Sequence, residues 1–250
     1  MTIMTTLAIL PLLPMLVLSL SNEYNIKAGK NVELLEHMLY MALCAGATNP
    51  AKCIPQHFVY TILKTFSADC SDTILKGECR ATVVFSAKEL ALGIFFKGPT
   101  KIAAFKSSAA NALSAQSLVD FNGRGRVGDQ FLITFNRLWN VQGLGSYVNE
   151  LWTEYCDLTL MVGGHSIASC NAQMAAVSIR SAGMWRKKKI IYYGYGTPRC
   201  GDQEFAARMD EAAYHRYRIN WLADNIPVND FPCPIVHDDS ALDCNLLNFS

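Results

Sequence analysis

The amino-acid sequence predicts an α/β fold, in which helices cover both faces of a mostly parallel sheet. Short apolar runs at 157–164, 190–198 and 215–221 have the length and composition of strands. The first run is almost wholly apolar, as expected of a central parallel strand that is buried on both faces. A run of small and apolar residues over 167–183 lies between the first two and predicts a helix. Strands that alternate with helices are typical of the α/β class.

The segments ahead of these strands predict further elements of the same domain. Apolar residues recur near helical spacing over 29–45, which predicts an amphipathic helix. The segment 81–98 predicts two apolar strands joined by a turn at "SAKE", and the segments 127–139 and 144–155 predict helices. Because the chain has no internal repeat, low-complexity tract or long linker, one domain over 22–250 is expected.

The first 21 residues predict a cleaved secretory signal peptide. They carry no charge, and an apolar stretch runs from Leu7 to Leu20 ahead of small residues that suit signal peptidase. The alternative is a membrane anchor, but the stretch is short, and Pro11 and Pro14 interrupt it, whereas a spanning helix needs about 20 apolar residues. We therefore expect a secreted, extracellular protein with no stable membrane insertion after removal of the signal.

Charge and composition argue against a nucleic-acid partner. The chain has 22 basic and 21 acidic residues and a net charge of +1, and the basic residues are dispersed. The only tight cluster, "RKKK" at 186–189, comes just before an apolar run. It is interpreted as the solvated edge of a buried strand and not as a nucleic-acid patch.

The nine cysteines fit the oxidising compartment that a signal peptide implies. Three pairs are each spaced so that a local disulfide would close a loop: Cys44 with Cys53, Cys70 with Cys79, and Cys233 with Cys244. Buried thiols are expected at the three cysteines in or beside apolar segments, which are Cys156, Cys170 and Cys200. No cysteine or histidine spacing resembles a zinc site, so no metal ion is expected.

The stretch "MVGGHSIASC" at 161–170 joins a predicted strand to a predicted helix and leaves two interpretations open for Ser166. A nucleophile elbow needs a serine at such a turn, flanked by small residues because strand and helix nearly touch there. The small residues are present, although Ala168 replaces the usual glycine. The alternative is that Ser166 is an ordinary helix N-cap. The motif alone does not decide between the two.

Four motifs in order resemble those of the class 3 (fungal-type) triacylglycerol lipases, a branch of the α/β-hydrolases, and in particular the secreted, cysteine-rich members found in nematodes. The family pattern is a strand ending in Phe-Arg-Gly-Thr/Ser, then Gly-His-Ser-Leu-Gly-Gly, then Gly-x-Pro-Arg-x-Gly-x-x-x-Phe-Ala, then Tyr-Arg with a later Asp-x-x-Pro. The corresponding stretches here are "IFFKG" (94–98), "GHSIAS" (164–169), "GTPRCGDQEFA" (196–206) and "YRINWLADNIP" (217–227). The resemblance implies an α/β-hydrolase fold and a secreted serine hydrolase that cleaves carboxylic esters of lipids, without metal or cofactor.

The resemblance also assigns the site residues. It places the nucleophile at Ser166 and the acid of the triad at Asp224, with one oxyanion donor at the backbone N–H of Ile167. The base must follow the acid in this fold, and His237 is the only histidine after Asp224. The second oxyanion donor of the family aligns with Pro99, which has no N–H, so Thr100 is the candidate.

Several departures from the family pattern keep a second hypothesis open. The family histidine usually comes much later in the chain than His237, and the C-terminus is expected to be shortened. Ala168, Pro99 and the missing histidine segment favour a catalytically impaired homologue that retains the fold and an apolar lipid-binding cleft. The stretch 100–113 falls where the family carries a lid helix, which would suit a substrate at a lipid–water interface, but a packed surface helix fits it equally.

Overall fold

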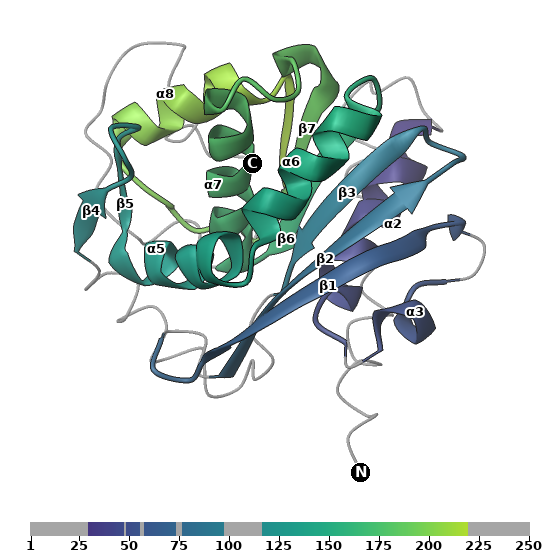
Figure 1. Ribbon diagram of the computed structural model, residues 1–250, viewed down its shortest axis with the longest axis horizontal. Helices are drawn as coiled ribbons and strands as arrows, with labels where there is room; N and C mark the ends of the chain where they lie inside the picture. The colour runs from purple at the N-terminus through teal and green to yellow at the C-terminus, as the bar shows by residue number, and fades with distance from the viewer. Residues whose placement is uncertain (1–29, 48, 56–57, 74–76, 98–116, 220–250) are drawn as a thin grey trace, which may run out of the picture.

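The computed structural model of the chain describes residues 30–47, 49–55, 58–73, 77–97 and 117–219. Within these ranges a six-stranded sheet forms the centre of the fold (Figure 1). In spatial order the strands are β1 (Thr61–Cys70), β2 (Gly77–Ser86), β3 (Ala91–Phe96), β6 (Thr159–His165), β7 (Ile190–Tyr195) and β8 (His215–Ile219). The β1–β2 and β2–β3 pairings are antiparallel, and the β3–β6, β6–β7 and β7–β8 pairings are parallel. The predicted α/β class with a mostly parallel sheet is confirmed.

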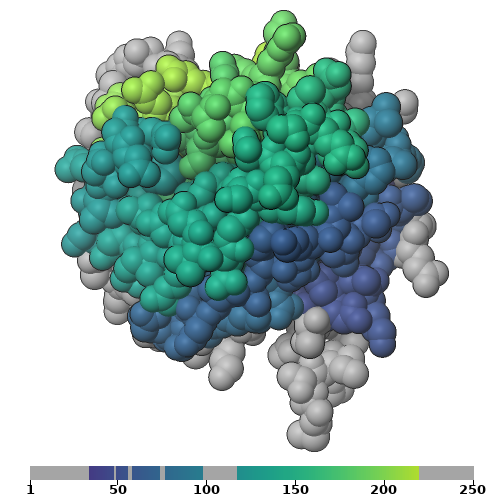
Figure 2. Space-filling view, in the orientation of Figure 1, coloured from purple at the N-terminus to yellow at the C-terminus, as the bar shows by residue number. Residues whose placement is uncertain are grey.

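Helices cover both faces of this sheet. On one face lie α5 (Asp129–Asn136), the π-helix η3 (Arg137–Val141), α6 (Leu144–Tyr155) and α7 (Ala168–Ser181). Figure 2 shows α5, η3 and α6 together over this face, with the edge strand β1 beside them. On the other face lies α2 (Lys30–Cys44), while α8 (Gln203–Ala212) packs against α7. The expected coverage of both faces is therefore present.

The remaining described elements are short. A separate hairpin consists of β4 (Leu118–Asp120) and β5 (Arg126–Gly128). The helix α3 (Pro50–Cys53) is a single turn, as is the 3-10 helix η4 (Lys187–Lys189). The latter belongs to the basic cluster 186–189 and directly precedes β7, and Arg186 and Lys188 are exposed there. The cluster is thus the solvated start of a buried strand, as the sequence predicted.

The central strands form because their residues are apolar on both sides of the chain. Every residue of β3 is buried, with Leu92 and Ile94 in the core beside α7, and Phe95 in the core beside α2. Successive side chains of a strand point to opposite faces, so one unbroken apolar run supplies both cores. By contrast β1 is an edge strand whose side chains are largely exposed. It carries little hydrophobic alternation, which is why the sequence did not predict it.

Most predicted helices and strands are confirmed, and one helix begins later than expected. The helix predicted over 127–139 starts at Asp129, because Arg126–Gly128 pairs with β4 as β5, and its last part is the π-helix η3. Helix α8 was not predicted. A helical signal was nevertheless present in its sequence, since the buried Phe205, Met209 and Ala212 follow one another at i, i+4 and i+7.

The cysteine predictions are partly confirmed. The local disulfides Cys44–Cys53 and Cys70–Cys79 are present. The expectation of buried thiols is wrong for Cys170 and Cys200, which form a third disulfide, and for Cys156, which is a free but exposed cysteine. The error has a physical cause: the third pair is separated by 30 residues in the sequence, so only the packing of α7 against the segment after β7 brings the two sulfurs together. The Cys233–Cys244 pair lies outside the described residues, as does the predicted signal segment 1–21.

The described residues contain neither a membrane-spanning helix nor a metal centre. None of the described helices combines the length and the apolar character needed to cross a bilayer. Within the same ranges, no three side chains of histidine, cysteine, aspartate or glutamate gather where they would hold a metal ion.

Candidate active site

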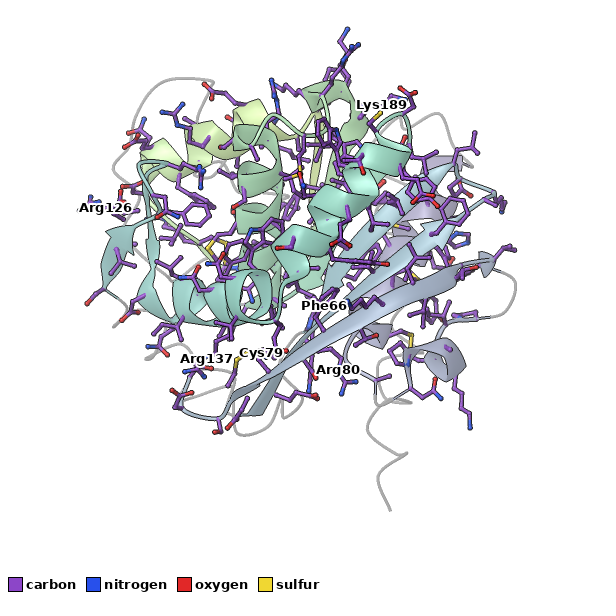
Figure 3. All side chains as sticks on the ribbon, in the orientation of Figure 1. Phe66, Cys79, Arg80, Arg126, Arg137 and Lys189 are labelled. Carbon is purple, nitrogen blue, oxygen red and sulfur yellow. A yellow bond between two sulfur atoms is a disulfide. The ribbon has the colours of Figure 1, made fainter. Side chains whose placement is uncertain are left out.

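Ser166 lies at the edge of the sheet where four parallel strands end. In spatial order these strands end at Phe96, His165, Tyr195 and Ile219. In open α/β sheets, ligands bind outside the carboxyl ends of the strands. Figure 3 labels a residue near each edge: Arg80 lies beside the end of β3, and Lys189 lies just before the start of β7, at the opposite end of the molecule. Ser166 shares the edge that Arg80 marks.

The backbone of Ser166 has the geometry of a tight strand-to-helix turn. Its φ is +58°, in the left-handed region that a non-glycine residue rarely adopts. Its N–H donates to the carbonyl of Tyr195 at 2.7 Å, and its own carbonyl accepts from the N–H of Ser169 at 3.0 Å and from the Ser169 hydroxyl. Strained backbone of this kind persists only where its surroundings hold it, and it clusters at functional sites.

The N-cap interpretation of Ser166 is wrong. Helix α7 begins at Ala168, its N-cap residue is Ile167, and no side chain caps it. An N-cap serine has extended backbone and uses its side chain to accept from the helix, whereas Ser166 has a positive φ and lies one residue further from the helix. The geometry is that of the elbow.

Gly164 provides the close approach of strand and helix at this turn. A Cβ atom on Gly164 would lie 2.6 Å from the carbonyl oxygen of Ala168 and 2.8 Å from the nitrogen of Ser169. Ala168 itself is fully buried and fits at the start of α7. The extra methyl of Ala168 is therefore accommodated, and the position that requires glycine lies on the strand side of the serine.

We expect Gly164→Ala to destabilise the fold by about 3 kcal/mol, because the new methyl meets backbone atoms that have no rotamer to yield. Denaturant unfolding monitored by circular dichroism measures the change. The matched variant is Gly183→Ala, since Gly183 has a φ of +72° but open space around its Cβ position. The loss of stability in Gly183→Ala reports backbone strain alone, and it should be only about 1 kcal/mol. Equal losses in both variants would show that contact at Gly164 is not the cause.

The backbone N–H of Ile167 is available for an oxyanion. Ile167 directly follows Ser166 at the N-terminal end of α7, where backbone dipoles favour a negative charge. Within the described ranges this N–H donates to no carbonyl or side chain. The side chain of Ile167 is fully buried, which anchors the peptide unit.

The start of the loop after β3 is held by charged groups. Lys97 follows Phe96 and donates its backbone N–H to the carbonyl of Arg80 at 2.8 Å. The side chain of Lys97 is nearly buried and lies 3.5 Å from Glu78, which also accepts from Arg80 at 2.6 Å. Lys97, at the position where the family pattern has arginine, thus has a carboxylate partner in Glu78. Thr100 follows three residues later, outside the described residues.

A buried polar cluster lies beneath the elbow and was missed in the sequence. The hydroxyl of Tyr192 accepts from Gln173 at 3.2 Å, donates to the carbonyl of Ser169 at 3.3 Å, and lies 3.3 Å from the hydroxyl of Thr197. The carbonyl of Thr197 in turn accepts from Arg218 of β8 at 2.8 Å. Burial raises the pKa of Tyr192 above its ordinary value, so its hydroxyl keeps its proton at neutral pH. The apolar run at 190–198 predicted the strand β7, but no sequence pattern predicted the hydrogen-bond partners of Tyr192.

Only part of the predicted site falls within the described residues. Ser166 and Ile167 are adjacent at the elbow, while Asp224, His237 and Thr100 lie outside the described ranges. Of the described histidines, His165 ends β6 directly before Ser166 and lies beside Tyr195. His37 packs against Phe58 in the core beside α2, and His215 begins β8 at the edge opposite Ser166.

Solved structures with the same architecture are lipases of fungi and yeast. The lipase of Rhizopus microsporus var. chinensis superposes with a TM-score of 0.63 at 19% identity, covering 76% of this chain and 67% of that one. The Lip2 lipase of Yarrowia lipolytica gives a TM-score of 0.64 at 15% identity, covering 80% and 74%. At these identities the likeness shows the fold alone. The fold is that of the α/β-hydrolases, and the strand-to-helix serine lies where this class carries a nucleophile.

The chain belongs to the family Lipase (class 3), whose model matches residues 94–231. The matched range includes Ser166, Ile167, Thr100 and Asp224, and it ends before His237. Lipase ZK262.3 of Caenorhabditis elegans is 24% identical over 196 residues, which are 76% of this chain and 53% of that protein. Phospholipase A1 EG1, chloroplastic/mitochondrial, of Oryza sativa subsp. indica is 26% identical over 51% of this chain and 27% of its own length. The chain thus spans about half, or less, of the curated relatives that it matches.

Proposed function

We propose that the protein is a secreted serine hydrolase that cleaves carboxylic esters of lipids, with Ser166 as nucleophile. The single observation that carries the proposal is the backbone of Ser166, which has a positive φ between a parallel strand and a helix of a class 3 lipase chain. Its relatives are named a lipase and a phospholipase A1, which supports lipid esters as the substrate class. The three disulfides support an oxidising, extracellular compartment. In this proposal residues 1–21 are a signal peptide that is removed, and residues 22–250 form one domain.

In this proposal the reaction runs in two steps. The Oγ of Ser166 attacks the ester carbonyl while a histidine, assigned to His237, takes its proton and passes it to the leaving alcohol. The backbone N–H groups of Ile167 and Thr100 stabilise the negative oxygen of the tetrahedral intermediate. Water then attacks the acyl-enzyme while the histidine takes its proton, and the histidine returns that proton to the Oγ of Ser166 as the acid leaves. No metal ion or organic cofactor takes part in any step.

Chain connectivity supports the assignment of Asp224 as the group that orients the histidine. Asp224 lies five positions after Ile219, where β8 ends at the same edge as Ser166. A span of five residues is at most about 18 Å long, so the chain connectivity is compatible with a carboxylate at that edge. Thr100 lies four positions after Phe96, and Phe96 ends β3, the strand that pairs with β6.

A lipid–water interface is the proposed setting for the reaction. A similar solved structure of a fungal lipase–inhibitor complex, with a TM-score of 0.63, is described as a model for interfacial activation. Another, of a triacylglycerol lipase with a TM-score of 0.62, is described as having a catalytic centre formed by a serine protease triad. The stretch 100–113, proposed as a lid, lies outside the described residues.

The second candidate is a catalytically impaired homologue that binds lipid in an apolar cleft. The observation that favours it is Pro99, which has no N–H to donate and aligns with the second oxyanion donor of the family. Loss of one such donor typically lowers kcat by about 10²- to 10³-fold.

Hydrolysis of emulsified tributyrin and of monomeric p-nitrophenyl butyrate separates the two candidates. We expect the purified protein to hydrolyse both, and His237→Asn to lower kcat by 10²- to 10⁴-fold, on the order of the contribution of a general base. The control is His215→Asn, at the opposite edge of the sheet, which should keep the wild-type rate. An inert wild-type protein would favour the impaired homologue, and an unchanged rate in His237→Asn would remove His237 from the triad.

A further inference from the structure

Ser169 departs from the family pattern at the turn itself. The resemblance puts glycine at this position, in Gly-His-Ser-Leu-Gly-Gly, whereas here the stretch reads "GHSIAS". A glycine has no side chain to donate a hydrogen bond. The hydroxyl of Ser169 is fully buried and donates to the carbonyl of Ser166, which also accepts from the backbone N–H of Ser169 at 3.0 Å.

The carbonyl that Ser169 holds belongs to the same peptide unit as the N–H of Ile167. A peptide unit is planar and trans, so its C=O and N–H point in opposite directions. When two donors of Ser169 fix the carbonyl of Ser166 toward the first turn of α7, they also fix the direction of the Ile167 N–H away from it. This N–H is the proposed oxyanion donor, and it has no other acceptor within the described part of the chain.

Tyr192 of β7 holds the backbone of Ser169 by a hydrogen bond. Its hydroxyl has one proton, which it donates to the carbonyl of Ser169 at 3.3 Å, while it accepts from Gln173 at 3.2 Å. Room for this hydroxyl exists because residue 194 is glycine: a Cβ there would lie 2.1 Å from the Tyr192 oxygen. The hydroxyl therefore fills the space that a side chain on β7 would otherwise take.

We propose that Ser169 and Tyr192 are positioning residues that orient the Ile167 N–H toward the oxyanion. The proposal rests on the proposed function, since it concerns the same site. In this chain Ser169 stands where the family pattern has glycine, and its hydroxyl adds a hydrogen bond that a glycine could not make. The two hydroxyls act in series, Tyr192 on Ser169 and Ser169 on the peptide unit that follows the nucleophile.

The test compares Ser169→Ala, Tyr192→Phe and the double variant in the full chain. An oxyanion donor acts in the transition state, so its misalignment lowers kcat and leaves KM unchanged. We expect kcat per active site, counted by titration with a fluorophosphonate, to fall 10- to 100-fold in Ser169→Ala and 3- to 10-fold in Tyr192→Phe. The double variant should lose less than the product of the two, because the residues act through one chain of bonds. The matched control is Tyr193→Phe, on the same strand but facing the core beside α2, and it should stay within twofold of wild type.

A purely structural role would lower the melting temperature and the number of titratable sites without changing kcat per site, and that result would overturn the proposal. So would additive losses in the double variant. An activity-independent readout separates this failure from failure of the proposed function. In Ser169→Ala the NMR resonance of the Ile167 backbone amide should shift, even if the wild-type protein is inert. An unchanged Ile167 amide would overturn the positioning role by itself.

Discussion

Ser166→Ala is expected to lower the kcat for ester hydrolysis by on the order of 10⁶-fold, which is the loss that follows removal of the nucleophile from a serine triad. The reason is that the acyl-enzyme cannot form without the Oγ atom, and only binding and oxyanion stabilisation remain. Ser166 is 6% exposed as a residue, and its backbone bonds to Tyr195 and Ser169 do not involve its hydroxyl. The fold should therefore survive the substitution, and p-nitrophenyl butyrate hydrolysis measures the loss.

The matched control for this prediction is Ser178→Ala. Ser178 is also a buried serine and lies near the far end of α7, about 15 Å along the helix axis from the first turn. This variant should hydrolyse the ester at the wild-type rate. Equal rates in the wild-type protein and in Ser166→Ala would contradict both the assigned nucleophile and the proposed enzyme activity.

Removal of the Cys170–Cys200 disulfide by substitution of both residues with alanine is expected to cost about 3–4 kcal/mol of stability. The bond closes a loop with a sequence separation of 30, the longest of the three disulfides, and the constraint on the unfolded chain grows with loop length. It also ties the first turn of α7, next to the elbow, to the segment that follows β7. The expected loss is larger than that for either local disulfide, whose sequence separation is 9.

Urea unfolding of the non-reduced proteins measures this effect as a lower midpoint of the unfolding transition. The control is Cys156→Ala, because Cys156 is an exposed cysteine outside the disulfides of the described residues, and its loss should leave the midpoint unchanged. A midpoint equal to that of the wild-type protein in the double variant would show that packing alone holds α7 to the segment after β7.

Periodicity predicted the elements that bury the most surface. The strand 157–164 and the helix 167–183 were found because their apolar residues leave a strong local pattern, and they appear as β6 and α7. The exposed edge strand β1 left no such pattern and was missed. Disulfides between neighbouring cysteines were predicted from spacing, whereas Cys170–Cys200 depends on elements that meet only in three dimensions.

The candidate site divides in the same way. Motifs in order along the chain were sufficient to point to Ser166 and Ile167 and to indicate the lipase family, because the motifs are contiguous in sequence. The bond from Ser169 to the peptide unit after the nucleophile, and the support of Ser169 by Tyr192 on another element, have no sequence signature. They arise because β7 and α7 pack closely enough for the hydroxyl of Tyr192 to reach the backbone carbonyl of Ser169.

The sequence by itself determined the α/β class, the family and the residue that is proposed to attack the substrate. Only the tertiary structure excluded the helix N-cap interpretation of Ser166, since an elbow and an N-cap need the same small residues and differ in the backbone angle φ. That angle is imposed by the strand before the serine, the helix after it and the bond to Tyr195, and so it is a property of the packed fold and not of the local sequence.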